Sequence, residues 1–189
     1  MAWPTSLQVA LKEWNTVCRA LETGRQMLLL RKGGISESGS GEFQVEHREF
    51  LLFPTFLHQN LNMLKPAEQA GYTALNEEPS EVAVSAAGVV TDIIQLKSRE
   101  QMNKIDDEHI WTAPLLDMRF TYRPENPLYL LLIRAHRLHA PVTIANTPAY
   151  AGCKSWVPLE LPIETGDALP VMDDVKFDLR RQSILDRIG

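Results

Sequence analysis

Two runs of the chain are apolar on both faces at once, and they constrain the fold more than any other feature. Residues 26–30 read Gln-Met-Leu-Leu-Leu, and residues 128–138 stay apolar until Arg134. Short runs of this kind are typical of central strands that are covered on both sides, although periodicity alone does not exclude a buried helix. A third stretch, residues 81–96, is rich in β-branched side chains. The sequence therefore predicts a sheet with helices packed against it.

Helical periodicity predicts four helices around these strands. From Leu7 to Leu21 apolar residues recur at steps of three and four, which is typical of one buried stripe and predicts a helix over residues 7–22. The other three helices are predicted at residues 56–69 with a break at Pro66, at residues 98–110, and from Asp173 onward. In the last helix we expect the inward residues to be Val175, Leu179 and Leu185.

The composition is that of one soluble domain over residues 1–189. With 44% apolar residues the chain has enough side chains for one core, and we interpret Trp14, Trp111 and Trp156 as anchors of that core. No segment approaches the roughly 18 consecutive apolar residues of a membrane helix, and the first residues do not resemble a signal peptide. The two cysteines are therefore expected to be reduced. We expect an α+β domain in the cytoplasm, without membrane association.

The negative charge of the chain lies in its middle third. The 24 acidic and 19 basic side chains give a formal net charge of −5. Residues 66–128 hold eleven acidic and five basic side chains, whereas the outer thirds are nearly balanced. Such runs usually form a solvated face, and here they leave open a protein partner with a basic surface. The low pI argues against a protein that coats DNA, but it permits a local basic cleft.

An alternating pattern changes phase within residues 43–53. Strict alternation would place Phe50 on the strand face opposite Val45, although both are apolar. The inside and the outside therefore exchange near residues 47–49, which indicates a bulge or tight turn there. Strands are predicted on either side of it, near residues 43–47 and 49–53.

The four polar residues at this irregularity form the candidate catalytic site. Glu46 and Glu49 are carboxylates that suit a divalent cation, Mg²⁺ or Mn²⁺. His47 suits a general acid or base, because the ordinary pKa of histidine is near neutrality. Phosphate contacts are assigned to three basic side chains: Arg31, Lys32 and Arg48. The alternative is a structural ion-pair cluster, since charges between apolar strands need partners.

The predicted element order resembles the α-β-β-β-α-β core of restriction-endonuclease-like proteins. Such sites use two carboxylates to hold a metal ion and a lysine to orient water. Here Glu46-His47-Arg48 supplies Glu-x-Arg in place of Glu-x-Lys. Arginine keeps the charge but differs in geometry and stays protonated, so it replaces lysine poorly. The hypothesis is therefore a divergent or inactive nuclease-like module.

Several segments also resemble one protein family. They are Leu11-Lys12-Glu13-Trp14, residues 29–35, residues 43–59 (FQVEHREFLLFPTFLHQ), residues 108–112, residues 132–134 and residues 152–156. Together they resemble the bacterial domain of unknown function 1802 family, which is common in cyanobacteria. The resemblance covers nearly the whole chain. It implies an association with restriction-endonuclease-like domains and favours nucleic-acid chemistry, without assigning a catalytic role to any residue.

Three functions remain open at this point. The first is nucleic-acid association, linked to restriction or DNA processing, with the polar groups at residues 46–49 and the basic side chains as its site. The second is a non-enzymatic protein that binds a partner through the acidic middle third. The third is a small enzyme acting on a phosphorylated metabolite through the same residues.

Overall fold

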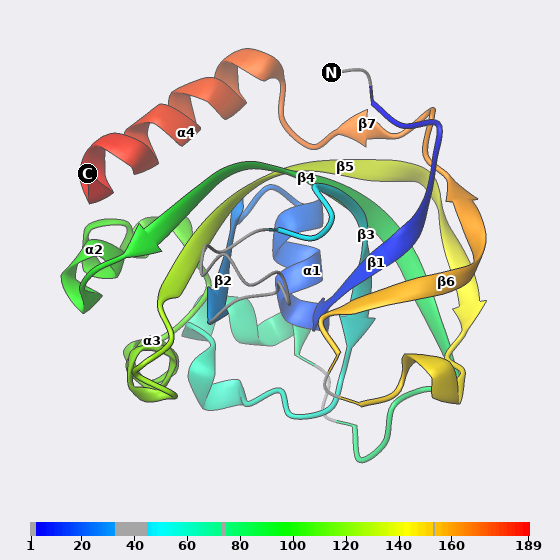
Figure 1. The fold of residues 1–189 in the computed structure, drawn as a ribbon, viewed down its shortest axis with the longest axis horizontal. Coiled ribbons are helices and arrows are strands. Elements are labelled where there is room, and N and C mark those ends of the chain that lie inside the picture. The colour runs from blue at the N-terminus through cyan, green and yellow to red at the C-terminus, as the bar shows by residue number, and fades with distance from the viewer. Residues whose placement is uncertain (1–2, 33–44, 73–74, 153) are drawn as a thin grey trace.

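One mixed sheet organises the chain (Figure 1). The computed structural model describes residues 3–32, 45–72, 75–152 and 154–189. Its strands are β1 (Ser6–Trp14), β2 (Leu28–Lys32), β3 (Glu49–Thr55), β4 (Glu81–Leu96), β5 (Leu128–Ala145), β6 (Trp156–Glu164) and β7 (Leu169–Pro170). The order across the seven-stranded sheet is β2-β5-β4-β3-β1-β6, and β7 pairs with β5. Strands β1 and β3 run parallel and the other pairs are antiparallel.

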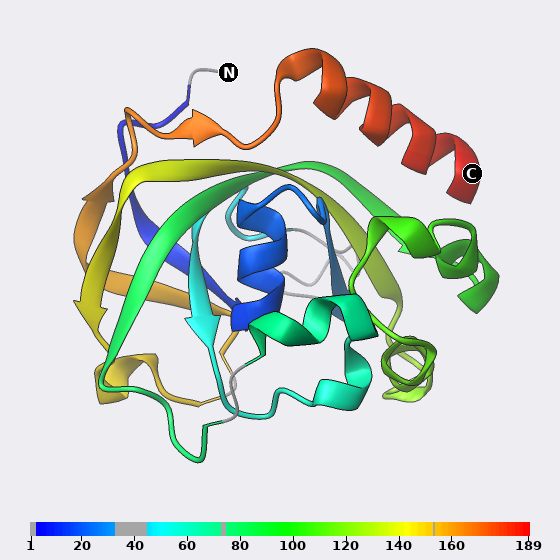
Figure 2. The ribbon, with the colours of Figure 1, turned by 180° about the vertical axis from the view of Figure 1, so that it is seen from behind.

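The sheet is strongly curved around its first helix. Figures 1 and 2 show the long strands β4 and β5 arching over α1 (Asn15–Glu22), which lies inside the curve. The other helices are α2 (Arg99–Lys104), α3 (Ala113–Thr121) and α4 (Asp174–Ile188), with 3-10 turns at Leu61–Met63, Pro66–Gly71, Asp106–Glu108 and Pro148–Tyr150. None of the helices in the described residues is long and apolar enough to cross a membrane.

At β3 the two faces of the sheet bury separate apolar clusters. On the concave side, Leu21 of α1 packs in one cluster with Leu29, Leu131 and Phe50. On the other side, residues such as Phe53 of β3 form a second cluster. Adjacent residues of β3 therefore enter different cores, which accounts for a strand that is apolar on both faces.

Strands β2, β4 and β5 confirm the predictions made from the apolar runs, whereas the first predicted helix is wrong. Residues 6–14 form strand β1, and only Asn15–Glu22 is helical. The strand pairs with β3 on one side and β6 on the other, and a register shift between Leu7 and Val9 interrupts its alternation. Because the alternation of this strand is interrupted, its apolar residues fall at steps of three and four, which is also the spacing of a helix.

Three further predictions are corrected by the structure. The helix predicted at residues 56–69 is replaced by two short 3-10 turns, and residues 98–110 form α2 followed by a 3-10 turn. Residues 45–48 precede β3 and lie outside any strand, while residues 43 and 44 lie outside the described residues. The element order of a restriction-endonuclease-like core is therefore not observed, because a strand precedes α1 and the helix expected after β3 is missing from the described chain.

Helix α4 begins where the sequence predicted, but it buries another face. Asp173 caps it by accepting a hydrogen bond from the Lys176 amide at 2.8 Å. Val175 and Leu179 are 70% and 68% exposed, respectively, contrary to the prediction. The buried side chains are instead Phe177, Ile184 and Ile188. The buried face also carries ion pairs that hold the helix on the sheet, among them Arg181 with Asp92.

Gly88 allows close packing at the centre of the sheet. It pairs with Phe50 of β3 and Ala135 of β5. A Cβ atom at this position would lie 2.7 Å from Cγ2 of Ile133 and 3.4 Å from the Phe50 ring. The first distance is too short for a carbon–carbon contact, so strand spacing here depends on the missing side chain.

Substituting Gly88→Ala is expected to lower the free energy of unfolding by about 2 kcal/mol, because the added methyl overpacks a rigid core. Urea denaturation measures the change. Gly166→Ala is the matched control, since its Cβ would meet its nearest atom at 3.5 Å, an ordinary contact. Equal stability of the two variants would contradict the role given to Gly88.

Two histidines are buried in the fold. The ring of His136 stacks on Trp3 with centroids 3.8 Å apart, and His109 stacks on Trp111 at 5.5 Å. Burial lowers the pKa of each imidazole to about 4, helped by Lys65 near His109 and Arg134 near His136. Both rings are therefore neutral in the folded protein at neutral pH.

The free energy of unfolding is expected to fall as the pH drops from about 6.5 toward 4. In this window the unfolded chain takes up protons that the folded chain cannot bind, at a cost of roughly 3 kcal/mol for each histidine. Above pH 6.5 the stabilisation is fully present. Denaturation of His136→Phe, which keeps a stacking ring but cannot be protonated, should show a flatter pH dependence than exposed His139→Asn. Equal slopes would contradict the assignment.

Candidate functional site

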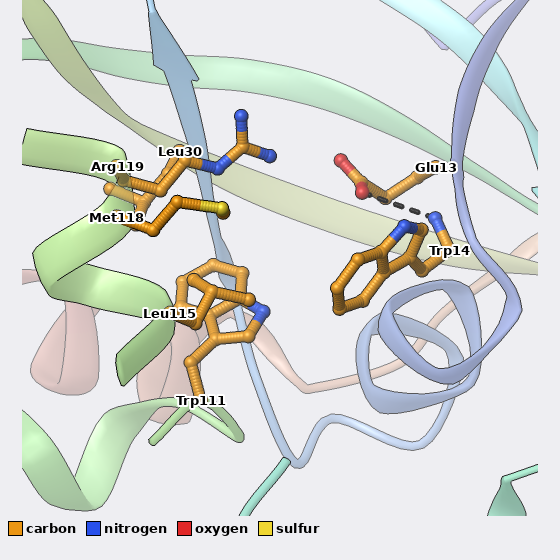
Figure 3. A pocket seen from close by; sticks show the side chains of 7 residues that line it. All are labelled: Glu13, Trp14, Leu30, Trp111, Leu115, Met118 and Arg119. Carbon is orange, nitrogen blue, oxygen red and sulfur yellow. Dashed lines mark hydrogen bonds between the residues drawn. The ribbon is translucent and has the colours of Figure 1, made fainter. Parts of the chain in front are cut away.

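A small recess lies where the end of β1, strand β2 and helix α3 meet. It is lined by Glu13, Trp14, Leu30, Trp111, Leu115, Met118 and Arg119 (Figure 3). The cavity volume is about 20 Å³, which is room for about one water molecule, and the empty space including open solvent at the mouth is about 320 Å³. The recess therefore combines apolar walls with one acidic and one basic side chain.

The polar end of the recess is built on an ion pair. Nη1 of Arg31 donates to Oε2 of Glu13 at 2.7 Å, and each side chain is only 11% exposed. The other carboxylate oxygen, Oε1, accepts a hydrogen bond from the Trp14 amide at 3.1 Å. Because Arg31 is on β2 and Glu13 is on β1, the pair connects two strands that are not neighbours in the sheet.

A second guanidinium faces the same carboxylate. Figure 3 shows Arg119 of α3 extending across the recess toward Glu13. The Nε atoms of Arg119 and Arg31 are both buried and have no hydrogen-bond partner in the described chain. Burial lowers the pKa of Arg119, while the charge of Glu13 acts in the opposite direction. Two cations thus share one anion, with donors left over for an acceptor group.

Aromatic and apolar side chains form the walls. In Figure 3 the indole of Trp14 lies on one side of the recess, with Leu115 and Met118 on the other. Trp111 is 4% exposed and packs on His109, so it forms a fixed floor. Met118 is 39% exposed and unbranched, which makes it the adaptable part of the wall.

The chain holds these walls through backbone and side-chain contacts. Strand β1 ends at Trp14 and α1 follows directly. The side-chain oxygen of Gln59 accepts hydrogen bonds from the amide and hydroxyl of Thr16, at 3.3 and 3.1 Å, and so caps the first turn of α1. Trp111 is held by a bridge to Leu64. The His-Gln end of the segment at residues 43–59 thus positions the recess without lining it.

The structure places the predicted phosphate ligands in different surroundings. Arg31 is held next to the recess by its ion pair with Glu13. Nζ of Lys32 donates a hydrogen bond to the carbonyl of Phe120 at 3.3 Å, and Phe120 follows Arg119 on helix α3. Arg48 is exposed and directly precedes β3, so it is not on either of the strands that carry this ion pair. The glycines that follow Lys32 lie outside the described residues.

The predicted catalytic residues lie at the entry to β3. Glu46 is 55% exposed, and its Oε1 is 3.6 Å from Nε2 of His47. The His47 ring contacts Trp156 edge-on with centroids 5.3 Å apart. Glu49 begins β3 opposite Val89 of β4. The described residues contain no group of three or more histidine, cysteine or acidic side chains placed to hold a metal ion, and metal binding by Glu46 and Glu49 stays a prediction.

Most acidic side chains of the middle third have partners within the chain. Arginine or lysine side chains pair with six of them: Glu68, Asp92, Asp106, Asp107, Glu108 and Asp117. Glu78 accepts hydrogen bonds from the amides of Phe56 and Leu57. These contacts connect much of the acidic surplus to the rest of the fold, although the side chains of Asp106, Asp107 and Asp117 are still 64%, 69% and 62% exposed.

The sequence analysis missed Glu13, Trp14, Trp111 and Arg119 as site residues. Three of them lie in segments that carry the family resemblance, Leu11–Trp14 and residues 108–112. That signal was available, but residues 7–22 were predicted as one helix with Glu13 outside its apolar stripe, and the tryptophans were interpreted as core anchors. Trp111 is indeed buried, and it serves both purposes. Nothing in its sequence surroundings singles out Arg119.

Substituting Glu13→Gln is expected to lower the free energy of unfolding by about 3 kcal/mol, because it leaves two buried guanidinium groups without their counter-charge. The matched control is Asp117→Asn, which breaks the pair with Arg99 at a carboxylate that is 62% exposed. That change should cost less than about 1 kcal/mol. Comparable losses in urea denaturation would show that the Glu13 pair is no more important than a surface pair.

The fold is similar to that of the ASCH protein from Zymomonas mobilis. Its crystal structure aligns with a TM-score of 0.44 and 11% identity, covering 94% of this chain and 93% of that one. A tyrosine-to-phenylalanine mutant of it aligns with a TM-score of 0.46 and 12% identity, covering 80% and 89%. A serine-to-alanine mutant gives 0.45 and 11%, covering 96% and 99%.

No curated protein sequence is detectably similar to this chain. A family match covers most of it, however, over residues 10–183. The matched region runs from β1 into α4 and includes every residue that lines the recess. It confirms the resemblance seen in the segments around Trp14 and Trp111. The chain belongs to the family described as "Domain of unknown function (DUF1802)".

Proposed function

We propose that this protein binds single-stranded nucleic acid by seating one unpaired base in the recess between Trp14 and Met118. The observation that carries the proposal is the buried, unpartnered Nε–H of Arg119, which lies on the side of the recess opposite the Trp14 indole. A buried donor without an acceptor is costly, and a ligand that supplies an acceptor removes that cost. A nucleobase combines such acceptors with a flat ring.

Stacking on Trp14 supplies the contact that does not depend on sequence. Aromatic side chains bind the faces of unpaired bases in many single-strand binding proteins. Trp14 is the more exposed of the two tryptophans at the recess, whereas Trp111 is closed off by its neighbours. The base therefore stacks on Trp14 and rests on Trp111.

The recess must widen to accept a base. Its closed part holds only about one water molecule, whereas ligand pockets usually enclose several hundred Å³. Met118 forms the outer wall, is partly exposed and has three rotatable side-chain bonds, so it is the group that moves. Such a change of side-chain rotamer is common when partners bind.

Basic side chains next to the recess suit the phosphate backbone. Arg31 and Arg119 outnumber Glu13, and Lys32 lies beside the end of α3. The local charge is therefore positive in a chain whose formal net charge is −5. Binding through these groups predicts affinity that falls as salt concentration rises.

Cleavage of the bound strand is a separate proposal. It would use Glu46 and Glu49 for Mg²⁺ or Mn²⁺ and His47 as acid or base, as predicted from the sequence. The contact between Glu46 and His47 gives only weak support for proton transfer between them, because both side chains are partly exposed. Incubating labelled strands with each metal, for the wild type and for Glu46→Ala, decides between binding and cleavage.

Substituting Trp14→Ala is expected to weaken binding of a labelled ten-nucleotide single strand by about tenfold or more, since stacking contributes about 1–3 kcal/mol per base. Fluorescence anisotropy at two salt concentrations measures the affinity. The matched control is Tyr122→Ala, which removes an exposed aromatic ring outside the recess.

Three outcomes are distinguishable. Loss of affinity in Trp14→Ala alone supports the recess. Equal loss in both variants, or none in either, places binding elsewhere. No binding of DNA or RNA by the wild type at low salt overturns the proposal, and pull-down of a protein partner or thermal stabilisation by a sugar phosphate would then favour the other two functions.

A further inference from the structure

The hydrogen-bonding groups of the recess also bear on which base it accepts. We infer that the recess selects guanine, an inference that rests on the proposed function and extends it. It follows from counting the donors and acceptors that Glu13 and Arg119 leave free. At the polar end of the recess an acceptor-only carboxylate and a donor-only guanidinium point toward each other, so one edge of an inserted base would meet both (Figure 3).

Glu13 has two acceptor positions left. A carboxylate accepts about four hydrogen bonds, two on each oxygen. Oε1 receives one from the Trp14 amide, and Oε2 receives one from Arg31. One position therefore remains on each of the two oxygens. They suit a ligand with two adjacent N–H donors.

Arg119 has the opposite requirement. Its Nε–H is buried and finds no acceptor among the described residues, and its guanidinium points toward Glu13. Nε of Arg31 is in the same condition. These donors suit an acceptor oxygen placed next to the two N–H groups of the ligand. The matching edge thus reads donor, donor, acceptor.

Guanine is the common base with that edge. Its N2 amino group and N1–H are adjacent donors, and O6 follows as an acceptor. Cytosine and adenine each offer one amino donor next to a ring-nitrogen acceptor, which would face the second Glu13 oxygen unfavourably. Uracil has a single N–H between two carbonyl oxygens. Binding of any of these leaves a buried charged group unsatisfied or repelled.

The preference follows from unpaired groups rather than from shape. A site built to bond a particular N–H rejects an analogue that lacks it, because its own buried acceptor is then left without a partner. Trp14 and Met118 contact the ring faces, which all bases share. The stacking contacts of Trp14 and Met118 therefore do not distinguish the bases, whereas the hydrogen bonds of Glu13 and Arg119 do.

The ligand itself provides the sharpest test. Four labelled oligouridine strands carry one central guanine, hypoxanthine, adenine or cytosine, and their affinities are compared by anisotropy. Hypoxanthine differs from guanine only by the missing N2 amino group. It should bind the wild type about tenfold more weakly, since a hydrogen bond to a charged group is lost.

Protein variants then assign the contacts. Arg119→Met keeps an apolar side chain of similar length and removes the donors, so the preference for the guanine strand over plain oligouridine should disappear, even though the lost charge also weakens binding of every strand. Glu13→Gln should lose the discrimination between guanine and hypoxanthine. Because Glu13→Gln is also expected to lower stability, the comparison of guanine with hypoxanthine on the unmodified protein is the independent measurement.

The two proposals fail separately. If none of the four strands binds, the proposed function fails. If all four bind with equal affinity and Trp14→Ala still weakens them, the base site stands and the guanine inference is wrong. A preference for adenine or cytosine also overturns it, because it would require an acceptor edge to face Glu13.

Discussion

The ion pair between Glu13 and Arg31 joins the edge strand β2 to β1, the second strand from the opposite edge of a strongly curved sheet. Strands β1 and β2 are separated in the sheet by β5, β4 and β3, so no backbone hydrogen bond connects them. Their side chains meet because the sheet curls around α1, and Nη2 of Arg31 also reaches the Lys12 carbonyl at 3.4 Å. Removing two charges from water is costly, and apolar side chains would fill the same gap at lower cost. A charged pair at this place therefore favours a role in binding as well as in closure.

The second arginine, Arg119, determines which ligand charge the site favours. A single carboxylate between Arg31 and Arg119 leaves an excess of positive charge in a partly closed site, although the chain as a whole is acidic. The net charge misleads here because many acidic groups of the middle third are paired inside the fold, for example Glu108 with Arg180 and Asp107 with Arg187. What a ligand meets is the local balance, which is set by three side chains at the recess.

The sequence predicted those parts of the fold that are fixed by local pattern. Apolar runs identified β2, β4 and β5, because a strand covered on both sides has no polar face. Asp173 identified the start of α4, because a capping side chain acts within its own turn. The predictions that were wrong concern features that are fixed by contacts with distant parts of the chain. Strand β1 carries a register shift after Leu7 in its pairing with β6, and the buried face of α4 is set by contacts with distant segments, such as the pair of Arg181 with Asp92 on β4.

The candidate site divides in the same way. Arg31 was predicted as a phosphate ligand from its place at a strand end, which stays a prediction, and in the structure it pairs with Glu13 of the recess. Glu13 could not be interpreted correctly while residues 7–22 were taken as one helix, since a helix would direct it to solvent and a strand directs it into the curve. Arg119 enters only because α3 packs beside the gap between β1 and β2. The walls of this site come from three segments that meet only when the sheet is curved. The periodicity of any one segment therefore does not predict the site.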